Sequence, residues 1–260
     1  MCNVHGIVKR ELLMSRKTVF LTGASSGLGM GMAREFAQRG YDLVLTARRL
    51  DLLENLAEEL THNSDARVVV KALDVTDISA VAQVLADAHQ QMGRLDIIIA
   101  NAGIGVNGRA GKSDFKDIER MIDVNVKGLM ATVEAGLPLL RNQSEGHIVG
   151  ISSVAGCRGL PSGGVYGATK AAVTNYLQAV QAETVNEPID VTILAPGYID
   201  TPINQGAKSR PFVIPPEIGC RKLVDAIEGK KQFAYIPGWP WSLLGPVLKR
   251  LPTRLIAKMA

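Results

Sequence analysis

The stretch "KTVFLTGASSGLG", residues 17–29, decides the fold. Its first six residues form an apolar run typical of a short buried strand, and glycines follow at positions 23, 27 and 29 before a helical pattern that extends to about Arg39. Glycines permit a tight turn and a close backbone approach, and the free N–H groups of a helix N-terminus favour an anion. The spacing differs from GxGxxG but the mechanics are the same, and the hydroxyls of Ser25 and Ser26 add donors. The stretch therefore predicts a strand–turn–helix unit that binds a pyrophosphate.

The rest of the chain repeats this alternation. Apolar runs that predict strands lie at 41–47, 66–75, 95–103, 146–153, 189–197 and 232–237, and helical patterns lie at 50–60, 78–93, 115–141, 164–186 and 216–228. Continuous apolar strands between helices indicate a parallel sheet that is buried on both faces. With right-handed crossovers, this predicts an α/β fold with a Rossmann-like, doubly wound parallel sheet of seven strands, and ligand sites at the carboxyl ends of those strands.

No repeat, low-complexity stretch or linker divides the sequence, so we expect a single domain at residues 16–238. It follows an N-terminal extension, 1–15, in which no chemistry is visible. Residues 239–260 combine tryptophans, leucines and basic residues, and we expect them to form a C-terminal amphipathic helical tail.

The composition is ordinary for a globular chain, with 260 residues, 47% hydrophobic side chains and a net charge of +4. Lysines and arginines are scattered, so we expect no nucleic-acid partner. The sparse cysteines lack a CxxC pair and the histidines are dispersed, which predicts a reducing, cytoplasmic location and no metal site. The uncharged stretch 232–248 contains Pro237, Pro240 and Pro246, so we do not expect it to span a membrane.

The end of the second predicted strand selects the cofactor. Dinucleotide-binding folds contact the adenosine ribose there, using a carboxylate for a 2′-hydroxyl or an arginine for a 2′-phosphate. The strand ends in Ala47, Arg48 and Arg49, with no acid before Asp51. A guanidinium makes strong bidentate contacts with phosphate. We therefore predict NADP(H), with Arg48 as the main contact to the 2′-phosphate. The alternative is that both arginines are solvated residues at a helix start.

Six motifs, taken in order, resemble the short-chain dehydrogenase/reductase family of the NADP(H)-preferring type. They are Thr22-Gly23-xxx-Gly27-x-Gly29, "NAG" at 101–103, Asn125 in "DVNVKG", "ISS" at 151–153, Tyr166-xxx-Lys170 and "PGYIDT" at 196–201. The resemblance covers roughly residues 16–236. It departs from the family at position 167, a glycine where many relatives have serine, and no general pattern continues beyond about Trp239.

The resemblance implies reduction of a small-to-medium apolar aldehyde or ketone, or the reverse reaction, by hydride transfer. It implies that Tyr166 protonates the carbonyl oxygen, that Ser153 hydrogen-bonds this oxygen, and that Lys170 binds the nicotinamide ribose and tunes Tyr166. Asn125 would hold a water that links Lys170 to solvent. Ser153 lies the family's 13 positions before the tyrosine, whereas Ser152 does not. The residues assigned to the cofactor site are Gly23, Ser25, Ser26, Gly27, Leu28, Gly29, Arg48, Arg49, Asp74, Val75, Asn101, Ala102, Gly103, Tyr166, Lys170, Pro196, Gly197, Ile199 and Thr201.

Tyr166 and Lys170 are four residues apart, so both side chains lie on one face of a helix. A free tyrosine has a pKa of about 10 and is a poor acid at neutral pH. We expect the Lys170 ammonium, with the positive nicotinamide of the oxidised cofactor, to lower the pKa of Tyr166. Taken singly, each of the four catalytic candidates has an ordinary structural explanation as a cap, a surface charge or a strand end; their joint spacing favours catalysis.

Two other functional classes compete with this hypothesis. A serine hydrolase is excluded, because Val154 breaks the GxSxG pattern and no histidine follows Ser153. A non-catalytic NADP(H)-binding sensor or scaffold on the same fold is the alternative, since a fold alone does not confer activity.

Residues 202–220 are expected to form a mobile lid over the substrate, where Phe212, Val213 and Ile214 either line an apolar pocket or merely pack the lid. The tail, 239–260, has three interpretations: a cover for an apolar substrate, a subunit contact, or an anchor on an anionic membrane surface. The first two together outweigh the third. The resemblance also implies a homodimer or homotetramer, formed through the helices at 115–141 and 164–186.

Overall fold

The computed structural model describes residues 16–143, 145–205 and 209–259. The predicted N-terminal extension, 1–15, lies outside the described residues, as do residues 206–208 of the predicted lid.

Seven parallel strands form one sheet in the order β3-β2-β1-β4-β5-β6-β7. The strands are β1 Thr18–Thr22, β2 Asp42–Ala47, β3 Val68–Ala72, β4 Ile97–Ala100, β5 Gly146–Ile151, β6 Ile189–Pro196 and β7 Phe233–Ile236. The direction of winding reverses between β1 and β4, and such a switch point opens a crevice at the carboxyl ends of the strands. The predicted doubly wound, seven-stranded parallel sheet is confirmed.

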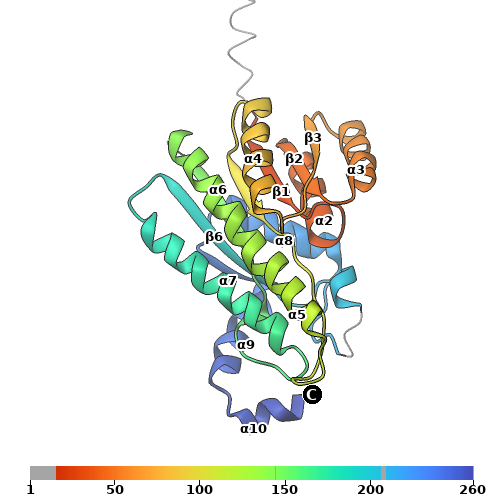
Figure 1. The fold of residues 1–260 in the computed structure, drawn as a ribbon, viewed down its shortest axis with the longest axis vertical. Coiled ribbons are helices and arrows are strands. Elements are labelled where there is room, and N and C mark those ends of the chain that lie inside the picture. Colours follow the sequence, from red (N-terminus) through yellow and green to blue (C-terminus); the bar gives the residue numbers. More distant parts are fainter. Residues whose placement is uncertain (1–15, 144, 206–208, 260) are drawn as a thin grey trace, which may run out of the picture.

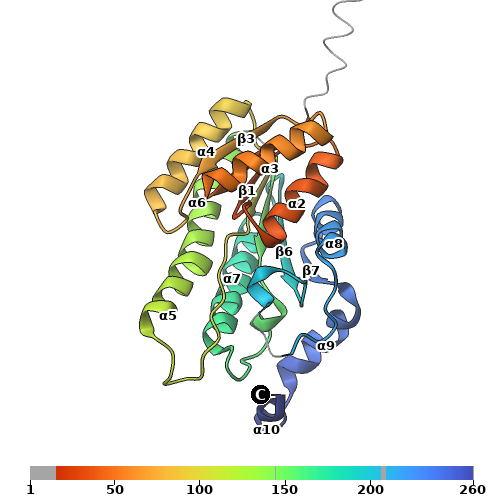
Figure 2. The ribbon, with the colours of Figure 1, turned by 90° about the vertical axis from the view of Figure 1, so that its right-hand side faces the viewer.

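Helices cover both faces of the sheet (Figure 2). One face carries α2 Gly27–Gln38, α3 Leu50–Asn63 and α8 Pro216–Glu228; the other carries α4 Ile78–Met92, α5 Phe115–Ile122, α6 Gly128–Gln143 and α7 Gly164–Glu183. Neighbouring strand residues point to opposite faces, so Leu21 packs under α2 and α8 while Phe20 packs under α4 and α6. This two-sided burial explains why the strands read as continuous apolar runs.

Local signals fix the helix ends. Asp77 precedes α4, and its side chain accepts a hydrogen bond from the backbone N–H of Ala80. Gly93 ends the same helix in the left-handed conformation, with φ +83°. These ends agree with the predicted start at residue 78 and the predicted stop at Gly93.

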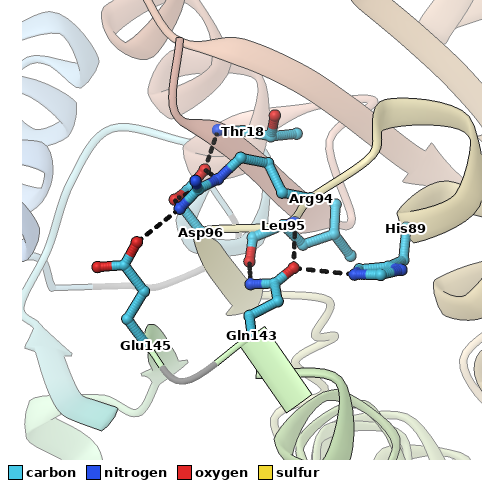
Figure 3. A network of polar contacts seen from close by, with 7 residues as sticks. All are labelled: Thr18, His89, Arg94, Leu95, Asp96, Gln143 and Glu145. Carbon is cyan, nitrogen blue, oxygen red and sulfur yellow. Dashed lines mark hydrogen bonds and ion pairs between the residues drawn. The ribbon is translucent and has the colours of Figure 1, made fainter. Parts of the chain in front are cut away.

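A polar network secures the amino-terminal edge of the sheet (Figure 3). Asp96 is buried, accepts a hydrogen bond of 2.7 Å from the Thr18 N–H and pairs with Arg94. The Gln143 side chain accepts from the Leu95 N–H at 3.0 Å and donates to the Leu95 carbonyl at 2.7 Å. The start of β4 is thus tied to β1 and to the end of α6, which holds the switch point in place.

The chain continues past β7 as α9, Gly238–Arg250, and α10, Thr253–Ile256. Both helices lie at the end of the molecule to which the strands' carboxyl ends point (Figure 1). Within the described part of the chain, no helix has both the length and the apolar character needed to cross a bilayer.

Candidate active site

A cleft of about 1170 Å³ opens at the carboxyl edge of the sheet. Every residue assigned from the sequence to the cofactor or the chemistry lines this cleft, with the exception of Asn125. Those lining residues are Gly23, Ser25, Ser26, Gly27, Leu28, Gly29, Arg48, Arg49, Asp74, Val75, Asn101, Ala102, Gly103, Ser153, Tyr166, Lys170, Pro196, Gly197, Ile199 and Thr201.

The glycine turn between β1 and α2 is shaped for a phosphate group. Gly23 and Gly27 have φ values of +69° and +57°, a region that disfavours side chains. A Cβ at Gly29 would lie 2.2 Å from the Gly23 carbonyl oxygen, so no other residue fits there without a shift of the backbone. Ser26 precedes α2 without capping it through its side chain, and the first turn of α2 contains no acid. The N–H groups of the helix start are therefore available to an anion, and the turn fits a dinucleotide pyrophosphate.

Asn101 braces this turn from the end of β4. Its side-chain Nδ2 donates to the Thr22 carbonyl at 2.8 Å and to the Gly23 carbonyl at 3.3 Å, and its backbone N–H donates to the Thr22 hydroxyl at 2.9 Å. The side-chain amide of Asn101 is thereby engaged with the protein, so its contribution to a cofactor site is to hold the glycine turn against β4.

The two arginines after β2 differ in their surroundings. The guanidinium of Arg49 lies over the glycine turn, where Nη2 donates to the hydroxyls of Ser25 and Ser26 at 3.1 and 3.2 Å. Arg48 is exposed at the end of the strand and also lines the cleft. The structure thus places two cations within one corner of the cleft, of which Arg49 is already bound to the loop.

Asp74 and Val75 form the neighbouring wall, two and three residues beyond the end of β3. The Asp74 carboxylate accepts from the backbone N–H of Thr76 at 3.0 Å and from its hydroxyl at 2.9 Å. These local bonds fix the orientation of Asp74. Val75 packs against α6, since a Cβ at Gly128 would lie 2.7 Å from its side chain.

The two serines after β5 point to different surroundings. Ser152 is buried, and its hydroxyl donates to the Lys170 carbonyl at 3.0 Å and is bonded to the Thr174 hydroxyl at 2.6 Å. Ser153 is half-buried, and its hydroxyl donates to the Pro196 carbonyl at 3.3 Å and accepts from the Ala155 N–H at 3.2 Å. Ser153 therefore lies between the ends of β5 and β6, whereas the hydroxyl of Ser152 serves the packing of α7.

Tyr166 and Lys170 lie one turn apart at the start of α7, as their spacing predicts. Lys170 is buried; its Nζ donates to the Ile151 carbonyl at 2.8 Å and lies 5.9 Å from the centroid of the Tyr166 ring. Burial lowers the pKa of Lys170 to about 8. Burial raises the pKa of Tyr166, and a hydrogen bond with Ser153 acts in the opposite direction.

The expected lowering of the Tyr166 pKa by Lys170 together with an oxidised nicotinamide stays a prediction; in the protein alone, burial of the phenol raises its pKa. The ammonium is held by the Ile151 carbonyl rather than directed at the phenolic oxygen. In this state the phenol keeps its proton through neutral pH.

Asn125 does not line the cleft but lies directly behind it, fully buried within the π-helical turn Asp123–Lys127 between α5 and α6. Its Oδ1 accepts from the Ile104 N–H at 2.8 Å, and its Nδ2 donates to the Ile104 carbonyl at 2.9 Å and to the Thr169 hydroxyl at 3.1 Å. A Cβ at Gly103 would lie 3.4 Å from Asn125 Oδ1 and 3.5 Å from Lys170 Nζ. Asn125 thus fixes the loop after β4 against α7, and π-helical turns are frequent at functional sites.

The tail contributes a wall of the cleft that the motifs did not assign. Trp241 of α9 is buried, and a Cβ at Gly197 would lie 2.2 Å from its Nε1, so the indole rests directly on the segment after β6. The indole N–H is buried and has no hydrogen-bond partner among the described residues. Leu248 of α9 also lines the cleft. The only signal in the sequence was the tryptophan-rich tail, and one of its three interpretations was a cover for the substrate.

The lid is anchored at both of its described ends. Ile199 and Ile214 form a parallel bridge, and Asp200 pairs with Arg210. Pro202, Ile203, Asn204, Ser209 and Pro211 line the cleft. Phe212 and Val213 are exposed, and the Phe212 ring packs edge-on against Trp241 at 5.9 Å. Phe212, Val213 and Ile214 are not among the residues that line the cleft: Phe212 contacts Trp241, Ile214 packs against the core and Val213 is exposed. The apolar lining comes from Ile203, Leu160, Trp241 and Leu248 instead.

Comparison with known proteins agrees with this arrangement. A family model described as short chain dehydrogenase matches residues 17–211. An uncharacterised oxidoreductase of Mycobacterium tuberculosis is 38% identical over 249 residues, which cover 95% of this chain and 98% of the relative. The similarity to that relative therefore extends past the sheet and into the tail.

Two solved structures resemble the chain closely. An alcohol dehydrogenase from the archaeon Thermococcus sibiricus, complexed with 5-hydroxy-NADP, has a TM-score of 0.78 at 28% identity, covering 85% of this chain and 96% of that one. A 3-ketoacyl-(acyl-carrier-protein) reductase from Brucella melitensis, complexed with NADH, has a TM-score of 0.78 at 25% identity, covering 86% and 96%. These neighbours bind nicotinamide dinucleotides of both kinds, with and without the 2′-phosphate.

Proposed function

The chain belongs to the short-chain dehydrogenase family, and from this premise we propose that it reduces a carbonyl group to an alcohol, or catalyses the reverse, with NADP(H). As an oxidoreductase of this family it uses a nicotinamide cofactor. One observation carries the proposal: Ser153, Tyr166 and Lys170 meet on one wall of the same cleft whose other wall is the glycine turn of β1.

In the proposed mechanism, the bound nicotinamide supplies or accepts the hydride. Tyr166 donates its phenolic proton to the carbonyl oxygen; burial raises the pKa of the phenol, so the nearby positive charge of Lys170 is needed to stabilise the phenolate that proton donation leaves. The Ser153 hydroxyl donates a hydrogen bond to the same oxygen and stabilises the charge that develops there. Lys170 holds the nicotinamide ribose and supplies positive charge beside the phenol. Asn125 keeps the loop behind Lys170 in position and holds the water that connects Lys170 to solvent.

The preference for NADP(H) is supported by the corner of the cleft after β2. Arg48 is exposed there and β2 ends without a carboxylate before Asp51, so a 2′-phosphate would gain a cation at the position where NAD-binding folds carry an acid. Arg49 is bound to Ser25 and Ser26. We therefore propose Arg48 as the main contact of the 2′-phosphate and Arg49 as a brace of the glycine turn.

The substrate class that fits the cleft is a small-to-medium apolar aldehyde or ketone. The walls beyond Tyr166 carry Leu160, Ile203, Trp241 and Leu248, which offer apolar contact and no charge. Apolar walls with a few placed polar groups are the usual composition of a site for such a ligand. We propose that residues 202–220 act as a lid over this part of the cleft.

We also propose a homodimer or homotetramer that forms through the long helices α6 and α7. These helices lie side by side on one face of the molecule, and α7 exposes the small residues Ala168, Ala171, Ala172 and Ala179 that allow close packing (Figure 1). A cytoplasmic location is supported by Cys157 and Cys220, which are both free thiols in the structure.

The proposal is tested by measuring NADPH and NADH consumption with a panel of apolar aldehydes and ketones. We expect turnover of at least one class of carbonyl compound, at a higher kcat/KM with NADPH than with NADH. Tight NADPH binding without turnover of any substrate would identify a non-catalytic sensor or scaffold instead. Equal efficiency with both cofactors would show that Arg48 does not contact the 2′-phosphate.

A further inference from the structure

Helix α9 has two apolar faces, and only one of them is used by the fold. Trp241, Gly245 and Leu248 face inward: Trp241 rests on Gly197, and a Cβ at Gly245 would lie 2.5 Å from the Tyr235 ring. The opposite face is exposed. It consists of Trp239, Leu243 and Val247, continued by Leu255 of α10, with exposed fractions of 75, 56, 46 and 49%. We name these four residues the tail face.

Exposed tryptophan and leucine side chains are unusual when they gather at helical spacing. Leu243 and Val247 are four residues apart, so they lie one above the other on α9. Trp239 precedes them and is the most exposed of the four. Several exposed apolar residues gathered in one short segment indicate an interaction site more than scattered single residues do.

The segment that carries the tail face contains basic residues and no acid. Lys249, Arg250, Arg254 and Lys258 are all exposed in it. Residues 239–260 contain four cationic and no acidic side chains, whereas the whole chain carries +4, so the remainder of the chain has no net charge. The entire positive excess of the protein therefore lies in the segment that carries the exposed apolar residues.

The placement of α9 and α10 makes this face accessible to a partner. In two perpendicular views, α10 lies at one extremity of the molecule and α9 lies at its periphery, beside β7 (Figures 1 and 2). Both helices are therefore at the surface, where a partner can reach their exposed residues.

We propose that the tail face docks the protein on the surface of an anionic lipid bilayer. Apolar side chains that enter the headgroup boundary, flanked by lysines and arginines that attract anionic lipid, are the features of an interfacial helix. Tryptophan in particular is favoured at the boundary between water and lipid. The docking rests on the exposure and charge of the tail and does not depend on the reaction proposed above.

A second copy of the chain fits the same face less well. A two-fold interface places the same patch of each subunit against the other. The four cations of one copy would then face those of its partner, with no acid in the segment to pair with them. Charge complementarity therefore favours anionic lipid over self-association at this face.

The test uses the full chain and vesicles of two compositions, one of phosphatidylcholine alone and one of phosphatidylcholine and phosphatidylglycerol in equal parts. We expect co-sedimentation with the anionic vesicles to exceed that with the neutral vesicles by about tenfold or more. The bound fraction should fall when salt is raised from about 0.1 M to about 1 M, because counterions screen the headgroup charge. Equal sedimentation with both vesicles, or none with either, would overturn the proposal.

Two double variants separate the contributions of the face. Trp239→Ser with Leu243→Ser removes its apolar part, and Lys249→Gln with Arg250→Gln removes half of its four cations; each should lower binding to anionic vesicles by about tenfold. Matched controls change exposed residues at the opposite, amino edge of the sheet: Val185→Ser with Phe233→Ser, and Lys17→Gln with Lys231→Gln. The controls should bind as the wild type does, and losses equal to those of the tail variants would contradict the proposal.

Sedimentation velocity without lipid measures the oligomeric state and so distinguishes lipid docking from self-association at the tail face. We expect the Trp239→Ser, Leu243→Ser variant to have the same oligomeric state as the wild type, since the changed residues lie at the surface. Dissociation of a wild-type oligomer into smaller species by these two changes would identify the face as a subunit contact and overturn the proposal.

Discussion

The Nζ atom of Lys170 lies 5.9 Å from the centroid of the Tyr166 ring and donates its hydrogen bond to the carbonyl of Ile151. Burial lowers the pKa of this ammonium to about 8 and raises the pKa of the phenol. Both shifts favour the uncharged forms. The phenol is therefore protonated at neutral pH, and donation of its proton to a carbonyl depends on the Lys170 charge to stabilise the phenolate that forms.

The first prediction concerns the effect of the buried Lys170 ammonium on the free energy of unfolding. A shift of its pKa from 10.5 to about 8 disfavours the folded, charged state by roughly 3 kcal/mol. Lys170→Met removes this penalty but also removes a charged hydrogen bond worth about 1.5–3 kcal/mol. We expect a net gain of about 1 kcal/mol in the free energy of unfolding at neutral pH, measured by urea denaturation, together with a loss of activity.

The pH dependence of stability in the wild type and in Lys170→Met tests whether burial of the ammonium causes the difference. Between about pH 8 and 10.5, Lys170 in the unfolded chain still holds a proton that the folded protein has released. The stability contributed by this residue must therefore rise with pH across that window. The advantage of Lys170→Met should shrink from neutral pH toward pH 10. A difference that stays constant with pH would show that burial of the ammonium is not its origin.

The second prediction separates the two arginines. Removing one charge-assisted contact to a phosphate weakens binding by about 1.5–3 kcal/mol, roughly 10- to 100-fold. Arg48→Ala should raise the KM for NADPH by this factor and leave the KM for NADH nearly unchanged. Arg49→Ala should weaken both cofactors to a smaller and similar extent, because it loosens Ser25 and Ser26. If the two variants exchange these phenotypes, Arg49 is the residue that contacts the 2′-phosphate.

The third prediction tests the glycine turn. In Gly29→Ala, the new methyl group would lie 2.2 Å from the Gly23 carbonyl oxygen, so the turn must open. We expect NADPH binding, followed by fluorescence, to weaken by about 100-fold or more, and stability to fall by about 1–3 kcal/mol. Gly238→Ala is the matched control, because a Cβ there meets nothing within 4 Å. Normal NADPH binding by Gly29→Ala would contradict the assignment of this turn to the pyrophosphate.

The fourth prediction concerns the indole of Trp241. Its buried N–H has no partner among the described residues, and an unsatisfied buried donor is destabilising. Trp241→Phe keeps an aromatic ring in place without this donor, so we expect its stability to equal that of the wild type or exceed it by about 1 kcal/mol. Trp241→Ala should cost about 3–5 kcal/mol. A loss of more than about 2 kcal/mol in Trp241→Phe would mean that the N–H has a partner.

The sheet and its helices could be predicted from the sequence because both depend on local patterns. The apolar runs of β1 and β4 are continuous since both faces are covered, and Asp77 and Gly93 mark the ends of α4 by their own backbone chemistry. The predicted lining of the cleft depends on fixed positions at the ends of strands, which the topology brings together.

The remaining features depend on contacts between distant segments. Nothing near Gly197 in the sequence shows that Trp241 rests on it, so the sequence alone could not separate a substrate cover from a subunit contact for the tail. The spacing of Tyr166 and Lys170 reports their proximity but not their burial, and burial raises the pKa of the phenol in the protein alone. Likewise, the π-helical turn at Asn125 has no signal in the pattern, which predicts one continuous helix over 115–141.

The most direct test of the central claim is the rate of NADPH-dependent carbonyl reduction by Tyr166→Phe. This change removes only the phenolic oxygen, so the ring stays in place and the glycine turn is untouched. We predict that kcat/KM falls by about 100- to 10,000-fold while the Kd for NADPH stays within about twofold of the wild type. A kcat/KM equal to that of the wild type would show that the proton comes from elsewhere and would contradict the account.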